Sequence, residues 1–104
     1  MKTIADIKTD IKDIRYYYSK RKDFDNASKT FVESAVIKKA EIYSNVIKTA
    51  PAKLYDLYVA FVVNNNSQVI VAEDWGFCVE YIKNLCRKMY AYLLAEMNIE
   101  TENT

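Results

Sequence analysis

Residues 66–87 read NSQVIVAEDWGFCVEYIKNLCR and contain Gly76, the only glycine in the 104-residue chain. Glycine adopts a positive φ at little cost and often ends a helix. Before it, Ser67 is a suitable N-cap for a short helix that ends at residue 75. After it, a second helix is expected, and the apolar residues around the turn should form one small core: Val71, Ala72, Trp75, Phe77, Ile82 and Leu85. This pattern is typical of a helix-turn-helix.

The second of these helices is predicted to have two distinct faces. At about 100° per residue, one face is apolar and consists of Ile82, Leu85, Met89 and Leu93. The opposite face is a polar stripe of Glu80, Lys83, Asn84 and Arg87. Lysine and arginine reach guanine or phosphate in the major groove, and asparagine pairs with adenine. The stripe therefore predicts contact with base edges of double-stranded DNA, with an ordinary solvated helix face as the alternative.

Two further residues complete the predicted DNA site. Gln68, at the start of the first motif helix, is expected to contact the DNA backbone, and Lys88 is expected to lie near a phosphate. Candidate DNA-binding residues are thus Gln68, Glu80, Lys83, Asn84, Arg87 and Lys88.

At these residues the chain resembles region four of sigma factors. Residues 53–58, KLYDLY, resemble the helix that precedes the motif there, and the pattern from Ser67 through Ala72 and Gly76 to Lys83 resembles the two motif helices. The chain is similar to small phage and prophage transcription regulators of the ArpU/RinA type. That resemblance implies double-stranded DNA as the partner, with RNA polymerase or another protein as a further candidate. Phage packaging proteins also use this motif, so transcription is not the only role it implies.

Three features depart from that family pattern. Cys78 stands where serine or threonine usually caps the recognition helix, and Val69 and Ile70 are apolar where polar residues are usual. Residues 54–104 also carry three basic and seven acidic side chains, whereas DNA-binding surfaces are usually basic. A second hypothesis therefore stays open, in which a helical adaptor keeps the helix-turn-helix fold and docks a protein.

Composition predicts one all-α domain over residues 1–104. Half of the chain is hydrophobic and 28% is charged, and a single glycine and a single proline leave few breaks between long helices. We expect two long N-terminal helices in residues 1–49, a three-helix unit with the helix-turn-helix in residues 51–97, and a flexible tail over residues 98–104. Residues 1–53 carry twelve basic and seven acidic side chains, which could add phosphate contacts.

The N-terminal half shows two amphipathic helices. The first has an apolar face formed by Ile4, Ile7, Ile11, Ile14 and Tyr18, which either packs on the next helix or makes a homodimer through the four isoleucines. The second is expected over residues 27–48, capped by Asp25 or Asn26, with an apolar face of Val32, Val36, Ala40, Tyr43 and Ile47.

A third helix should begin near Pro51. Its predicted buried residues are Leu54, Leu57, Tyr58 and Phe61. The alternative is a β-hairpin over residues 59–71, because this stretch is rich in β-branched residues around three asparagines.

The sequence offers little for catalysis, and we expect no enzyme activity, cofactor or metal. The chain has no histidine and no glycine-rich phosphate loop. Asp6, Asp10 and Asp13 alternate with lysines at helical spacing and are interpreted as exposed ion-pairing residues. Two cysteines without histidine do not make a zinc site, and both Cys78 and Cys86 are expected to be small buried residues.

The remaining expectations concern location and the tyrosines. The sequence shows no signal peptide and no apolar run long enough to cross a membrane, and unpaired cysteines suit a reducing cytoplasm.

The nine tyrosines are expected at the edge of the core with their hydroxyl groups in water.

Overall fold

The computed structural model describes residues 1–20 and 31–102. Over these residues the chain is helical and contains no strand, which confirms the all-α prediction for this part of the chain. The elements are α1 (Ile4–Ser19), α3 (Phe31–Ile47), α4 (Ala52–Tyr58), the π-helix η1 (Val59–Val63), α5 (Gln68–Trp75) and α6 (Val79–Glu102). The β-hairpin alternative is wrong, because η1 continues α4 and α5 begins at Gln68.

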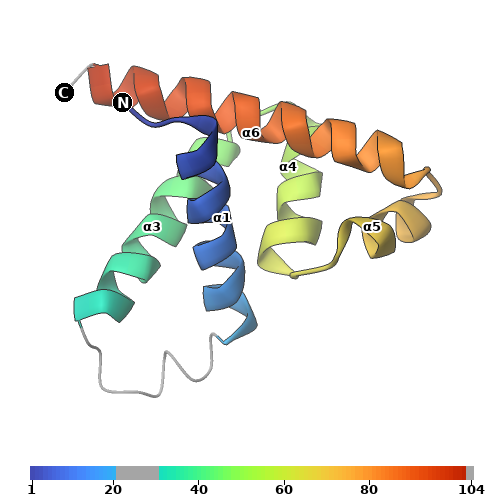
Figure 1. Cartoon of the computed structure of the whole chain (residues 1–104), viewed down its shortest axis with the longest axis horizontal. Helices are drawn as coiled ribbons and strands as arrows, with labels where there is room; N and C mark the ends of the chain where they lie inside the picture. The colour runs from blue at the N-terminus through green and yellow to red at the C-terminus, as the bar shows by residue number, and fades with distance from the viewer. Residues whose placement is uncertain (21–30, 103–104) are drawn as a thin grey trace.

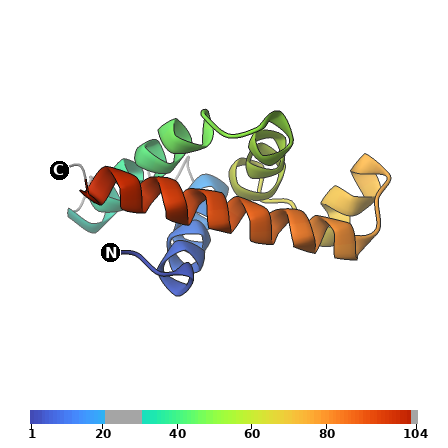
Figure 2. The ribbon, with the colours of Figure 1, turned by 90° about the horizontal axis from the view of Figure 1, so that it is seen from above.

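The longest helix, α6, organises the arrangement. It runs along the length of the molecule, with α1 and α3 beneath one half and α4 and α5 beneath the other (Figure 1). Seen from above, α6 crosses over α1 and reaches from the two chain ends to the turn that leads back to α5 (Figure 2). Helices α1, α3, α4 and α5 therefore all pack against α6, and η1 packs on α1, α4 and α5.

The core follows the predicted apolar faces. On α6 the buried residues include the predicted set of Ile82, Leu85, Met89 and Leu93. In the α4–η1 segment Leu57, Tyr58 and Phe61 are buried, as predicted, and Leu54 is half-buried. On α3 the buried residues include Ala40, Tyr43 and Ile47, with Val36 packed at the edge.

The isoleucines of α1 are part of this same core. Ile7, Ile11 and Ile14 are at most 1% exposed, and α1 packs against α3, η1 and α6. Only Ile4 is partly open, at 38% exposure. The homodimer surface predicted from the four isoleucines is therefore wrong, because the chain itself covers three of them.

The last helix is longer than the sequence predicted. The last helix continues past Met97 to Glu102. Asn98 on that helix holds the segment before α1 in place. Lys2 donates its backbone N–H to Asn98 Oδ1 at 2.9 Å, and Asn98 Nδ2 donates to the Lys2 carbonyl at 3.3 Å. The described part of α3 ends at Ile47, and its expected start at residue 27 and caps at Asp25 and Asn26 lie outside the described residues.

A buried carboxylate joins α1 to α3, and its burial corrects the interpretation of Asp10 as an exposed residue. Asp10 is 7% exposed and accepts a hydrogen bond from the Tyr43 hydroxyl at 2.6 Å. Its oxygens also lie 2.9 Å from Lys2 Nζ and 3.1 Å from Lys39 Nζ. Burial raises the pKa of the Asp10 carboxyl, but these three donors outweigh burial and leave the pKa below its ordinary value of 3.8.

The hydroxyl groups of two buried tyrosines lie in the core, contrary to the expectation that tyrosine hydroxyls meet water. Tyr43 and Tyr58 are each 1% exposed, so their hydroxyl groups are not in bulk water. Tyr43 donates to Asp10, whereas the Tyr58 hydroxyl has no hydrogen-bond partner among the described residues. Burial raises the pKa of both phenols, which keeps them neutral.

Candidate nucleic-acid interface

The turn between α5 and α6 has the geometry expected from its sequence. The Ser67 side chain accepts a hydrogen bond from the Ile70 N–H at 3.2 Å and caps α5. Gly76 ends α5 in the left-handed region, with φ of 74°. The Phe77 N–H then donates to the Ala72 carbonyl at 2.9 Å, and α6 begins at Val79. Both the predicted N-cap and the predicted turn glycine are confirmed.

Replacing Gly76 by valine is expected to lower the free energy of unfolding by about 1–2 kcal/mol, because a β-branched residue is strained at positive φ. A Cβ at Gly76 would meet nothing within 4 Å, so the cost comes from the backbone alone. Gly76→Asn is the matched control and should cost less, since asparagine tolerates this region. Urea unfolding measures the free energy of unfolding of both variants. If the valine variant is as stable as the wild type, valine at position 76 causes no backbone strain and the prediction is wrong.

The residues that hold the two motif helices together are buried. Ala72, Ile82 and Leu85 are 2%, 0% and 6% exposed, and Val71 beside them is 1% exposed. Phe77, however, is 43% exposed, so its predicted place in this core is wrong. Phe77 follows the glycine directly, and the chain has already turned away from the α5–α6 contact at that point.

The polar stripe lies on the exposed side of α6. Glu80, Lys83, Asn84 and Arg87 are all exposed, opposite the buried seam. Within the stripe, Lys83 Nζ lies 3.6 Å from a Glu80 carboxylate oxygen, and Arg87 donates to the Asn84 side-chain oxygen. An exposed ion pair contributes only about 0.2–1 kcal/mol, so these side chains can exchange their present partners for a ligand at low cost.

The other two predicted site residues differ in exposure. Lys88 is exposed one turn beyond Asn84. Gln68 is half-buried at the start of α5, and its side chain lies near the Cys86 thiol. Burial raises the pKa of that thiol, although the Gln68 contact opposes the rise. Cys86 is buried as predicted, whereas Cys78 is exposed, contrary to the prediction, because it lies in the turn before α6.

A cluster of one lysine and two aromatic rings flanks the start of α6, and sequence reasoning missed it. The Phe77 and Tyr81 ring centroids are 4.5 Å apart. Lys53 Nζ, from the first turn of α4, lies 5.7 Å from the Phe77 centroid and 5.5 Å from the Tyr81 centroid, and donates to the Tyr81 hydroxyl at 2.9 Å. The only signal in the sequence was the pair of aromatic residues Phe77 and Tyr81, which follow the turn glycine at helical spacing.

The outer face of α5 combines apolar and acidic side chains. Val69 is 49% exposed and Ile70 is 42% exposed, and Glu73 and Asp74 are exposed on the same helix. This surface is unlike a phosphate-binding surface, because its charge is negative. It is the part of the α5–α6 unit that the adaptor hypothesis requires.

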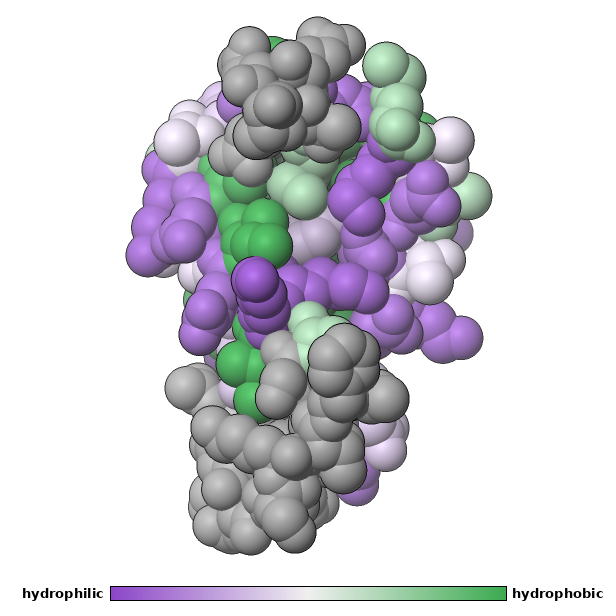
Figure 3. Space-filling view, turned by 90° about the vertical axis from the view of Figure 1, so that its left-hand side faces the viewer, coloured by the Kyte–Doolittle hydropathy of each residue, from purple (hydrophilic) through white to green (hydrophobic). Residues whose placement is uncertain are grey.

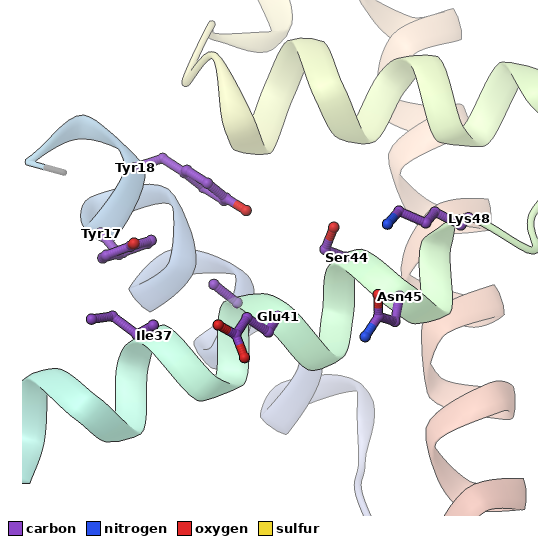
Figure 4. Close-up of a pocket in the computed structure, with 8 residues that line it drawn as sticks. Tyr17, Tyr18, Ile37, Glu41, Ser44, Asn45 and Lys48 are labelled. Carbon is purple, nitrogen blue, oxygen red and sulfur yellow. The ribbon is translucent and has the colours of Figure 1, made fainter.

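Two hollows in the described part of the chain lie away from α5. One, of about 420 Å³, lies between α1 and α3, where Tyr17 and Tyr18 face Glu41, Ser44, Asn45 and Lys48 (Figure 4). The other, of about 250 Å³, is mostly apolar, and Lys2, Lys38, Lys39, Ile42 and Met97 are among its lining residues. The end of the molecule remote from α5 exposes mainly hydrophilic side chains, with a strip of hydrophobic ones between them (Figure 3).

Among the described residues, no group of three or more histidine, cysteine, aspartate or glutamate side chains is placed to hold a metal ion. No helix in the described ranges combines the length and the apolar character needed to cross a membrane. Comparison of the chain with protein families, curated proteins and solved structures gives no match.

Proposed function

We propose that this protein is a DNA-binding regulator that reads double-stranded DNA with α6. In this proposal α4, α5 and α6 act as a helix-turn-helix unit, and α1 and α3 form the N-terminal part that supports it. The observation that carries the proposal is the position of the polar stripe. Glu80, Lys83, Asn84 and Arg87 are exposed together on the helix that follows a left-handed glycine turn, and Ala72, Ile82 and Leu85 are buried beneath them.

Each stripe residue has a chemical role in this proposal. Lys83 and Arg87 donate to guanine or to phosphate, Asn84 pairs with adenine, and Glu80 accepts from the cytosine amino group. Lys88 and Gln68 contact the sugar-phosphate backbone on the two sides of the stripe. A bidentate base contact contributes about 1–3 kcal/mol of discrimination between base pairs. The exposed Glu80–Lys83 ion pair that it replaces stabilises the protein by less, about 0.2–1 kcal/mol.

The family resemblance adds a cellular role to the proposal. A regulator of the phage or prophage ArpU/RinA type, with a sigma region-four-like motif, would act in the cytoplasm on transcription. RNA polymerase or another protein would be its further partner. A homodimer remains part of the proposal because two copies double the contact with DNA, but its surface must differ from the buried face of α1.

The direct test is selection from random DNA. The purified protein is incubated with a random duplex pool at low salt, and the retained sequences are amplified and tested by fluorescence anisotropy at two salt concentrations. A shared motif should emerge, and the affinity should fall as salt rises, because phosphate contacts release counterions. Failure of the wild type to retain any duplex at low salt would refute the proposal.

A second candidate function is favoured by one observation. Val69 and Ile70 expose nearly half of their surface beside the acidic Glu73 and Asp74. As an adaptor, the protein would dock an amphipathic basic helix of a partner protein on this face. If the protein is retained on immobilised DNA and released as the salt concentration rises, the result supports the regulator. The adaptor hypothesis instead expects no retention on DNA.

A further inference from the structure

The helix that carries the stripe lies between two others that meet it on different sides. Gln68 of α5 reaches α6 at Cys86, and Lys53 of α4 reaches α6 at Tyr81. At about 100° per residue, Tyr81 and Cys86 lie about 140° apart around the helix axis. The polar stripe occupies the exposed sector between these two sides. The stripe is therefore bordered by α5 on one side, the α5 flank, and by α4 on the other side, the α4 flank.

The α4 flank contains a cation whose position is fixed by its neighbours. The Lys53 ammonium group lies 5.7 Å from the Phe77 ring centroid and donates to the Tyr81 hydroxyl at the edge of the Tyr81 ring. In the described part of the chain it makes no ion pair, whereas Lys2, Lys39 and Lys83 each lie against a carboxylate. An ammonium group has three N–H donors, so two of those of Lys53 are left for a ligand. Tyr81 and Lys88, seven residues apart, share this flank of α6.

We infer that Lys53 is a phosphate-binding residue on the α4 flank of the DNA interface. This inference rests on the proposed function, and it assigns a contact outside the helix-turn-helix residues themselves. A helix in the major groove has a sugar-phosphate strand on each side, and contacts to those strands fix its orientation. Phe77 and Tyr81 hold the Lys53 cation beside the stripe before DNA arrives, which reduces the ordering cost of the contact. The exposed Phe77 and the half-buried Tyr81 thus act as a support for the lysine.

The test is the salt dependence of binding by Lys53→Gln to the DNA selected with the wild type. One lost phosphate contact should reduce the slope of log affinity against log salt by about 0.9. Between about 50 and 200 mM salt, the wild type should therefore lose about 3.5-fold more affinity than the variant. The preference for selected over scrambled DNA should stay unchanged, because a phosphate contact carries no base information.

Two control variants sharpen this test. Lys53→Arg keeps a cation and its donors and should retain the wild-type slope. Lys8→Gln removes a lysine on α1 whose Nζ lies 6.0 Å from the Tyr90 ring centroid, and it should change the slope less than Lys53→Gln does. Thermal unfolding of each variant checks that the fold is intact.

The outcomes separate the inference from the proposed function. If the wild type binds selected DNA and Lys53→Gln keeps the wild-type slope, Lys53 makes no phosphate contact and the proposed function stands. If Lys53→Gln loses sequence preference as well as slope, Lys53 positions the turn, and the phosphate assignment is wrong. If the wild type binds no DNA at low salt, both the proposed function and the inference fail.

Discussion

The double substitution Lys83→Ala, Arg87→Ala should reduce affinity for the selected DNA by at least about 30-fold and leave the helix content unchanged. Each lost base contact costs about 1–3 kcal/mol, so two contacts cost about 2 kcal/mol or more. Both side chains are exposed and lie opposite the buried seam of α6. Their truncation removes only the Lys83–Glu80 pair and the Arg87–Asn84 hydrogen bond, which are surface contacts.

The matched control removes the same charge from another helix. Lys8 and Lys12 are exposed on α1, so Lys8→Ala, Lys12→Ala changes the net charge equally and spares the stripe. This control should weaken binding only mildly and to the same extent for every duplex. Anisotropy titrations measure affinity, and far-UV circular dichroism measures helix content. Equal losses in the two double variants would show that net charge, and not the stripe, attracts DNA.

The second large effect is expected in stability. Asp10→Ala should lower the free energy of unfolding by about 1–3 kcal/mol at neutral pH, because the buried Tyr43 hydroxyl loses its acceptor. Lys2 and Lys39 lose their shared carboxylate too, but their side chains are about one-third exposed and regain water. Asp13→Ala is the control one turn away, since the Asp13 side chain is 45% exposed and its oxygen lies 3.5 Å from Lys39 Nζ. It should cost less than about 1 kcal/mol.

The stability difference should depend on pH with a definite sign. The folded-state pKa of Asp10 lies below its ordinary value of 3.8, because three donors outweigh the effect of burial. The carboxylate therefore stabilises the fold above about pH 4. This contribution is lost as the pH falls through the folded-state pKa. Urea unfolding of wild type and Asp10→Ala at about pH 7 and about pH 3 should show the gap narrowing; a gap that stays constant would contradict the role of the carboxylate.

Patterns of residues in the sequence correctly predicted the structural features that depend only on residues close together in the sequence. Gly76, the Ser67 cap and the alternation of buried and exposed residues on α6 are set by backbone preference and helical periodicity. The same reasoning placed Phe77 in the core, which is wrong, because periodicity does not show where a chain leaves one helix and joins the next. It also could not foresee Lys53 at the start of α6, since residues 53 and 81 meet only when α4 packs on that helix.

The amino-acid sequence alone determined the helical class, the turn and the two faces of the last helix, because each depends on interactions within a few residues. Tertiary structure decided what each face meets. It turned the isoleucines of α1 inward, which removed them as a dimer surface, and it buried Asp10 between lysines from the N-terminus and from α3. An amphipathic helix needs an apolar partner, but its own sequence does not say whether that partner is in the same chain or in another. Only packing makes that choice, through the apolar area that each arrangement removes from water.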